Sequence, residues 1–250
     1  MEQYASAAYC KNNYNSPGDN IKCPSGTCPL VQAANASSVI EYASTDVTGY
    51  VGTDPTNKLV VVAFRGSVSL DNWLTNLNYK AVNIDLCSGC TAHAGFWQSW
   101  LDSRKDILAA LKQLAKSHPD YKIVATGHSL GGAIASLAAA QLRNDGYTVA
   151  LYTFGAPRIA GTKLSDYITN QPGGNFRVTH WNDPVPRVPP IAMGFAHISP
   201  EYYINKRNNQ QVGTGDIKTF DGAFNLRGNA AWLMTDIFAH GWYFNSIASC

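Results

Sequence analysis

Ser129 lies at the centre of the pentapeptide Gly-His-Ser-Leu-Gly, residues 127–131. Glycines two positions before and after a serine are typical of the sharp strand-to-helix turn that presents a nucleophilic hydroxyl. The pattern alone is weak, because a glycine-rich turn without chemistry would look the same. An apolar run before it (122–126) and an alanine-rich run after it (132–142) indicate the required strand and helix. The sequence therefore predicts that Ser129 is a nucleophile for acyl transfer.

A serine hydroxyl needs a base to take its proton and a third group to orient that base. In folds with this turn, the acid and then the histidine follow the serine along the chain. Asp183 follows an expected strand at 176–180 and precedes a proline-rich loop, so it is the predicted acid. His240, beyond an apolar stretch at 230–238 that we expect to be helix-like, is the predicted base. His197 is the alternative base, or else a core histidine.

The negative charge that forms on an attacked ester oxygen needs donors already aimed at it. The backbone amide of Leu130, directly after the nucleophile, is one predicted donor. Ser67 follows the β-branched run 59–64, which is typical of a central strand buried on both faces. Its amide and hydroxyl are the second predicted donor group.

Strands and helices alternate along the chain, which predicts an α/β fold with a mostly parallel sheet covered on both faces. No repeat or linker composition divides residues 1–250, so we expect one domain. The expected elements are a helix near 4–10, a strand pair within 39–51, strands at 59–64, 122–126, 149–154 and 176–180, and helices at 96–115 and 132–142.

Six cysteines allow 15 disulfide pairings, so their number does not determine the connectivity. Local pairing is the simplest interpretation, with two clipped loops and the remaining pair joining the chain ends. The alternative is a zinc site of four thiolates, which leaves the two terminal cysteines unexplained. The candidates are Cys23, Cys28, Cys87 and Cys90 for the loops or the zinc, and Cys10 and Cys250 for the ends.

The composition excludes several classes of function. The 250 residues are 45% hydrophobic and 14% charged, with a net charge of +2 and no basic stripe, which disfavours nucleic-acid binding. No apolar run is long enough to span a bilayer, and residues 1–4 lack the order of a signal peptide, so we expect a mature secreted form. Asn35 begins an Asn-Ala-Ser triplet, a weak glycosylation signal.

Five segments together resemble the secreted fungal lipases of the class 3 family, nearest the Thermomyces-type lipases, over residues 4–250. They are Phe-Arg-Gly-Ser at 64–67, the pentapeptide at 127–131, Phe-Gly-Ala-Pro-Arg at 154–158, Asn-Asp-Pro-Val-Pro-Arg at 182–187 and Ala-His-Gly-Trp-Tyr-Phe at 239–244. The resemblance implies an α/β-hydrolase fold, a triad of Ser129, Asp183 and His240, oxyanion donors Ser67 and Leu130, and disulfides Cys10–Cys250, Cys23–Cys28 and Cys87–Cys90. Gly241 departs from the larger apolar residue that is frequent in the family.

The resemblance also draws attention to residues 69–76, next to Ser67. The residues Leu70, Trp73, Leu74 and Leu77 follow a spacing of i, i+3, i+4 and i+7, and Ser69 is positioned to cap a short helix. We expect an amphipathic lid that contacts a lipid surface. The alternative is an ordinary surface helix with its apolar stripe on the core.

These features predict a triacylglycerol lipase that needs no metal, organic cofactor or protein partner and acts at an oil–water interface. Alternatives with the same chemistry are a feruloyl esterase, a phospholipase and a partial-glyceride lipase. From another class, an inactive binding module on a hydrolase fold is the remaining alternative.

Overall fold

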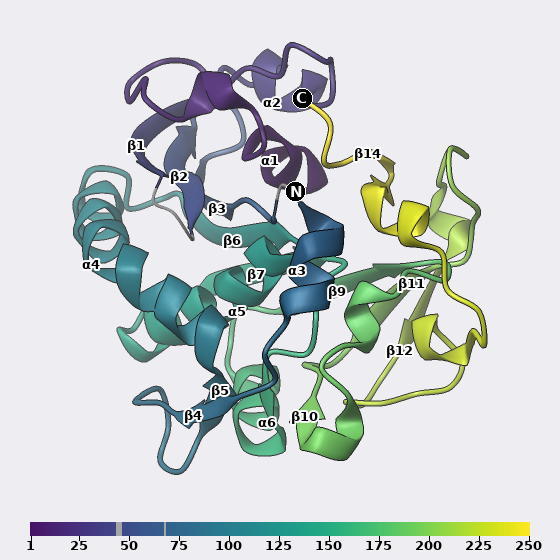
Figure 1. Ribbon diagram of the computed structural model, residues 1–250. Helices are drawn as coiled ribbons and strands as arrows, with labels where there is room; N and C mark the ends of the chain where they lie inside the picture. The colour runs from purple at the N-terminus through teal and green to yellow at the C-terminus, as the bar shows by residue number, and fades with distance from the viewer. Residues whose placement is uncertain (44–46, 68) are drawn as a thin grey trace.

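The computed structural model describes residues 1–43, 47–67 and 69–250; the side chains of residues 70, 71 and 76 lie outside that description. The chain is organised around an eight-stranded sheet (Figure 1). Five neighbouring strands, from β3 to β11, run parallel, and the outer pairs are antiparallel. In spatial order the strands are β1 (Ser37–Ala43), β2 (Thr48–Asp54), β3 (Leu59–Phe64), β6 (Lys122–His128), β7 (Val149–Phe154), β9 (Asn175–His180), β11 (Glu201–Ile204) and β12 (Ile217–Phe220). The predicted α/β-hydrolase fold with a mostly parallel sheet is confirmed.

The position of strand β3 in the sheet explains why its sequence is apolar without interruption. Val60, Val62 and Phe64 join the main core under the helices of one face, whereas Val61 and Ala63 join a second cluster on the other face. Side chains alternate along a strand, so both sets are buried only because both faces are covered there. The main core is covered by α4 (Ala94–Ser117), α5 (Leu130–Asn144) and α6 (Thr162–Asn170), and the opposite face by α1 (Glu2–Ala7) and α2 (Pro29–Ala33).

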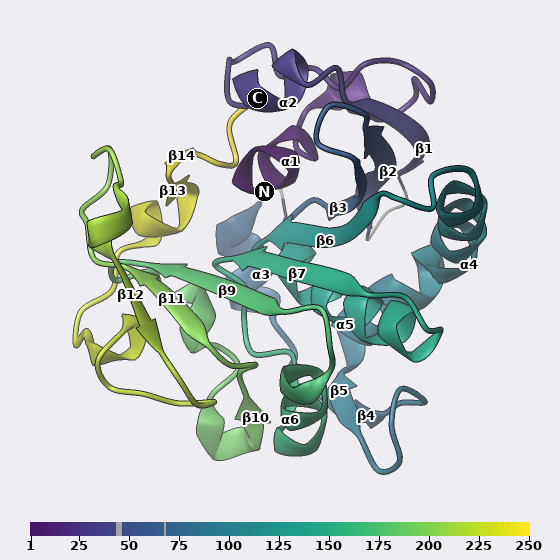
Figure 2. The same ribbon diagram turned by 180° about the vertical axis from the view of Figure 1, so that it is seen from behind.

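The cover on the opposite face is incomplete. Figure 2 shows β7, β9 and β11 from behind, with no α-helix of the described chain lying in front of them. Half-buried aromatic rings occupy that surface instead, and they contact one another across the strands. The ring centroids are 4.3 Å apart between Tyr152 and Phe176, and 5.6 Å apart between Phe176 and Tyr202. The prediction of a sheet covered on both faces therefore holds only for part of the sheet.

The remaining elements are short. A second sheet contains β4 (Ala81–Asn83), β5 (Thr91–His93), β8 (Ala160–Gly161) and β10 (Phe195–Ala196), and β13 (Trp242–Tyr243) pairs with β14 (Asn245–Ser246). Helix α3 spans Leu70–Asn76. The single-turn 3₁₀ helices are η1 (Lys11–Asn13), η2 (Val185–Arg187), η3 (Ile191–Met193), η4 (Thr214–Asp216), η5 (Asn229–Ala231) and η6 (Ile237–Gly241).

The helix expected at 230–238 is absent from the described chain, so that prediction is wrong. Two 3₁₀ turns, η5 and η6, flank an irregular segment instead. Leu233 and Met234 are 100% and 81% exposed, so the apolar pattern does not mark a buried helix face here. Asp236 caps η6 by accepting from Phe238 N, which starts a new turn at that point.

All six cysteines form the disulfides that the resemblance implies, Cys10–Cys250, Cys23–Cys28 and Cys87–Cys90. The alternative of a zinc site of four thiolates is therefore wrong. Within the described ranges, no group of three or more His, Cys, Asp or Glu residues is arranged to hold a metal ion. No helix there is long and apolar enough to cross a membrane.

Candidate active site

The turn at Ser129 has the geometry that the glycine spacing predicts. Strand β6 ends at His128 and α5 begins at Leu130, with Ser129 between them at φ 57° and ψ −129°. A Cβ atom at Gly127 would lie 2.7 Å from Gly132 N, and one at Gly131 would lie 2.7 Å from the carbonyl carbon of Phe64. Backbone atoms cannot yield as side chains do, so both positions require glycine. The strain at Ser129 is of the kind found at functional sites.

Asp183 and His240 form a buried pair. His240 Nδ1 lies 2.8 Å from Asp183 Oδ2, and the two side chains are 3% and 0% exposed. The other carboxylate oxygen, Oδ1, accepts from Val185 N at 2.8 Å. Because Nδ1 donates to the carboxylate, Nε2 of a neutral His240 carries the lone pair. This is the tautomer that a general base needs.

Ser129 and His240 line the same cavity of about 760 Å³. Neither Ser129 Oγ nor His240 Nε2 has a hydrogen-bond partner among the described residues, although both atoms are buried. Buried polar atoms without partners are rare and are explained where a substrate supplies the partner. The structure thus brings all three residues of the predicted triad to one site, Asp183 through its bond to His240.

Tyr243 is a contact of the acid that the sequence did not reveal. Its hydroxyl donates to Asp183 Oδ2 at 2.6 Å, and the side chain is fully buried. Burial, followed by the nearby charge of Asp183, raises the pKa of Tyr243 well above its ordinary value. A raised pKa keeps the hydroxyl in its protonated form, in which it donates to Asp183.

His128, the second residue of the pentapeptide, links the turn to two distant segments. Its Nε2 lies 2.8 Å from the carbonyl oxygen of His240, so this nitrogen is the donor, and Nδ1 accepts from the Tyr9 hydroxyl at 2.7 Å. Burial, and then the proximity of His240, lowers the pKa of His128 well below its ordinary value. A neutral His128 therefore holds the main chain of the predicted base in place.

The two predicted oxyanion donors lie beside the nucleophile. Leu130 is the first residue of α5, and the first amides of a helix have no acceptor within it. Ser67 lines both the cavity of Ser129 and a second cavity of about 660 Å³, which Leu130 also lines. A Cβ atom at Gly66 would lie 2.9 Å from Ser129 Cβ, so the Ser67 segment runs directly against the nucleophile.

Helix α3 and the residue after it carry the predicted lid residues, and α3 contributes to the lining of both cavities. Trp73 and Leu77 line the second cavity and pack against the main core, with the Trp73 ring 6.3 Å from that of Phe96. Leu74 is half-buried, whereas the side chain of Leu70 lies outside the described part. Ser69 precedes the helix, but its side chain makes no capping hydrogen bond.

His197 is not brought to Ser129. Its Nε2 lies 2.6 Å from the carbonyl oxygen of Pro186, and it lines a separate small cavity. Burial, followed by Arg177 and Arg158, lowers the pKa of His197 well below its ordinary value. It fits the alternative reading of a satisfied core histidine. At Gly241, a Cβ atom would meet nothing within 4 Å, so an alanine would fit there without displacing the His240 loop.

Comparison with known proteins identifies the family of the chain. The family profile of lipase (class 3) matches residues 61–193. The secreted mono- and diacylglycerol lipase A of Penicillium cyclopium is 46% identical, over 97% of this chain and 82% of the relative. The secreted mono- and diacylglycerol lipase 1 of Fusarium solani is 41% identical, over 99% and 75%. The crystal structure of the Aspergillus oryzae mono- and diacylglycerol lipase superposes with a TM-score of 0.95 at 44% identity, covering 99% of this chain and 95% of that one. The chain therefore belongs to the class 3 lipase family, whose α/β-hydrolase fold and serine esterase activity it shares.

Proposed function

We propose that Ser129, His240 and Asp183 are the catalytic triad of this lipase. Ser129 Oγ attacks the ester carbonyl carbon while His240 Nε2 takes the hydroxyl proton. The same nitrogen then returns the proton to the leaving alcohol, and a water molecule activated by His240 releases the acid from Ser129. Asp183 holds the required tautomer of His240 throughout. The unpartnered Ser129 Oγ and His240 Nε2 in one cavity are the observation that carries this proposal.

The oxyanion is stabilised by the backbone amide of Leu130 and by the amide and hydroxyl of Ser67. Leu130 N is free of helical hydrogen bonding, and the start of α5 favours developing negative charge next to Ser129. Ser67 lines both cavities. If the acid and alcohol parts of the substrate occupy different cavities, the ester group between them lies next to Ser67. These steps use only groups of the chain and water.

The substrates are acylglycerols. The curated relatives are named mono- and diacylglycerol lipases, which supports partial glycerides as substrates beside triacylglycerol. The second cavity is suited to bind the acyl chain of the substrate. Its apolar wall consists of Trp73, Leu77 and Phe96 and lies beside the oxyanion donors. A feruloyl esterase or phospholipase has no specific observation in its favour.

Contact with a lipid surface involves residues 69–76 as a lid and a second exposed apolar group next to the site. Leu233, Met234 and Phe238 are 100%, 81% and 78% exposed, and Phe238 lines the cavity of Ser129. Such a patch is costly in water and finds apolar partners at a lipid surface. The packing of Trp73 against the core supports a lid that is closed in water.

Secretion fits the three disulfides, which persist outside the reducing cytosol. We propose that residues 1–250 act as one domain, without a protein partner. The hydrophobic clusters on the two faces of the sheet are built from the same strands, which supports a single folding unit.

Labelling by a fluorophosphonate, compared between the native chain and Ser129→Ala, tests the nucleophile. Labelling that survives in Ser129→Ala would refute the triad, whereas no labelling of the native chain would support an inactive binding module. The rate of hydrolysis of emulsified mono-, di- and triacylglycerols, compared with that of methyl ferulate, tests the substrate class.

The dependence of the rate on glyceride concentration tests the lid. We expect the rate to jump as the glyceride passes its solubility limit, and a smooth hyperbola would refute the lid.

A further inference from the structure

The loop that carries Asp183, residues 181–189, receives hydrogen bonds from the main chain and from buried side chains of other segments. Partly buried main-chain carbonyl groups outside a regular sheet or α-helix need such donors. Five carbonyl oxygens of the loop accept hydrogen bonds from three buried side chains. Asn229 donates to those of residues 181 and 183, His197 to that of 186, and Arg158 to those of 187 and 189.

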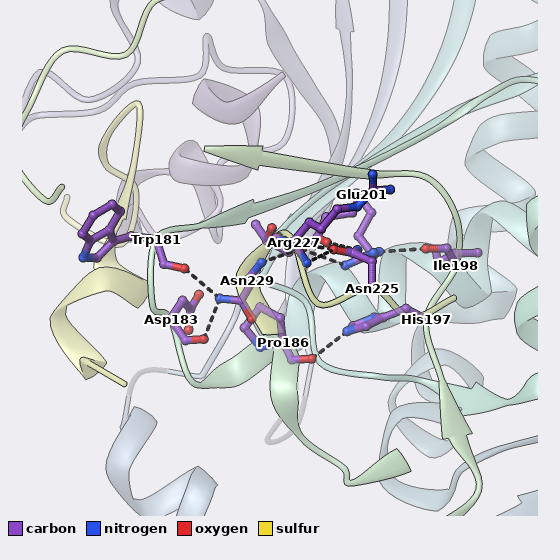
Figure 3. Close-up of polar contacts among 12 residues, drawn as sticks. Trp181, Asp183, Pro186, His197, Ile198, Glu201, Asn225, Arg227 and Asn229 are labelled. Carbon is purple, nitrogen blue, oxygen red and sulfur yellow. Dashed lines mark hydrogen bonds and ion pairs between the residues drawn. The ribbon is translucent and has the colours of Figure 1, made fainter. Parts of the chain in front are cut away.

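Among these donors, Asn229 acts on Asp183 itself. Its Nδ2 donates to the carbonyl oxygens of Trp181 at 3.1 Å and Asp183 at 2.9 Å, so one amide closes both ends of the turn (Figure 3). Trp181 has φ 40°, which a bulky side chain adopts only when its surroundings hold it there. Asn229 thus restrains the main chain of Asp183, whereas His240 and Tyr243 bind its carboxylate.

Asn229 is in turn fixed to the central sheet by Glu201 of β11. Glu201 Oε1 accepts from Asn229 N at 3.3 Å and from the Thr179 hydroxyl at 2.6 Å, and Oε2 accepts from Asn225 Nδ2 at 2.5 Å. Glu201 is 3% exposed, and Arg177 Nη1 lies 3.9 Å away. These contacts tie residues 225–229 to the strand beside β9 (Figure 3).

We propose that Asn229 is a positioning residue for catalysis, which sets where the Asp183 carboxylate meets His240. The inference rests on the proposed function, because it requires Asp183 to orient the base. Loss of the Asn229 amide frees both carbonyl groups and lets the turn shift. A displacement of about 1 Å in a catalytic group lowers turnover by up to about 100-fold.

A double-mutant cycle tests this role on a soluble short-chain p-nitrophenyl ester, so that the lid and the interface play no part. We expect Asn229→Ala to lower kcat by about 10- to 100-fold and to change KM by less than about threefold. In an Asp183→Asn background, the same substitution should lower kcat by less than about threefold, because its effect passes through Asp183. A kcat of folded Asn229→Ala within threefold of native, or equal losses in both backgrounds, would overturn the proposal.

His197→Ala is the matched control, since it also removes one buried donor to the same loop, at residue 186. We expect it to lower the unfolding temperature while leaving kcat within about threefold. If Asn229→Ala does not fold, Asn229→Ser retains a single donor and should give an intermediate loss of kcat; native kcat in Asn229→Ser would refute the proposal. Residual activity of Ser129→Ala would refute the triad, whereas native activity of Asn229→Ala would refute only the positioning role. The failure of one hypothesis is therefore distinguishable from the failure of the other.

Discussion

Gly155 makes the position of the triad sensitive to one added methyl group. It follows β7 at φ +59°, and a Cβ atom there would lie 2.9 Å from His240 Cε1, 2.9 Å from the Tyr243 hydroxyl and 3.0 Å from Asp183 Oδ2. Carbon atoms in contact prefer about 3.5 to 4.0 Å, so at least one of these groups must move by about 0.5 to 1 Å. All three are buried, and His240 and Tyr243 both bond to Asp183, so a shift of one of them disturbs the others.

We expect Gly155→Ala to lower kcat by about 30- to 100-fold, a loss of about 2 to 3 kcal/mol of transition-state stabilisation. The positive φ adds about 1 to 2 kcal/mol to the loss of folding stability. Gly146→Ala is the matched control, because its φ is +91° and a Cβ atom there meets nothing within 4 Å. The assay is kcat on a soluble p-nitrophenyl ester beside urea unfolding of both variants. A folded Gly155→Ala enzyme with kcat within about threefold of native would refute the reasoning.

Three further predictions concern stability. Burial raises the pKa of Glu2 to about 8, so the folded protein holds a proton that the unfolded chain has released above about pH 4.5, and stability falls as pH rises between these values. In the native protein this effect should lower the free energy of unfolding by up to about 4 kcal/mol between pH 5 and pH 8, and Glu2→Gln should remove that decrease. Urea unfolding at both pH values measures it, and the same pH dependence in both proteins would contradict the prediction. Tyr243→Phe should lower the free energy of unfolding by about 1.5 to 3 kcal/mol. Its kcat should change by less than about threefold, because the Tyr243 hydroxyl binds Asp183 equally before and during the reaction; a tenfold loss on the soluble ester would show otherwise. Replacing Cys10 and Cys250 by serine opens a loop of 240 residues. The lost constraint should lower the free energy of unfolding by about 5 kcal/mol in a denaturant titration, and a change below about 1 kcal/mol would count against it.

Local sequence patterns predicted the parts of the structure that depend on neighbouring residues. The bounds of β3 at 59–64 and β7 at 149–154 agree with the structure, because short apolar runs between turn residues mark buried strands. The glycine spacing around Ser129 located the turn, because two backbone contacts there exclude any side chain. Chain order then indicated Asp183 as the acid and left His240 and His197 as the candidate bases.

The partners of these residues could not be read from the sequence. Tyr243 is 60 residues from Asp183, and His128 is 112 residues from His240. Asn229 reaches Asp183 from 46 residues away, through a segment whose apolar spacing wrongly indicated a helix. Contacts of this kind arise from tertiary packing, and they leave no periodicity in the sequence.

The Cys10–Cys250 disulfide turns almost the whole chain into a covalent ring. A protease that cuts one exposed loop, such as the turn at 209–211, opens the ring without releasing either piece. The cut ends stay attached to a folded body, so refolding after a local opening remains intramolecular. Two cuts are needed before any fragment can diffuse away, which favours persistence among the proteases of an extracellular medium.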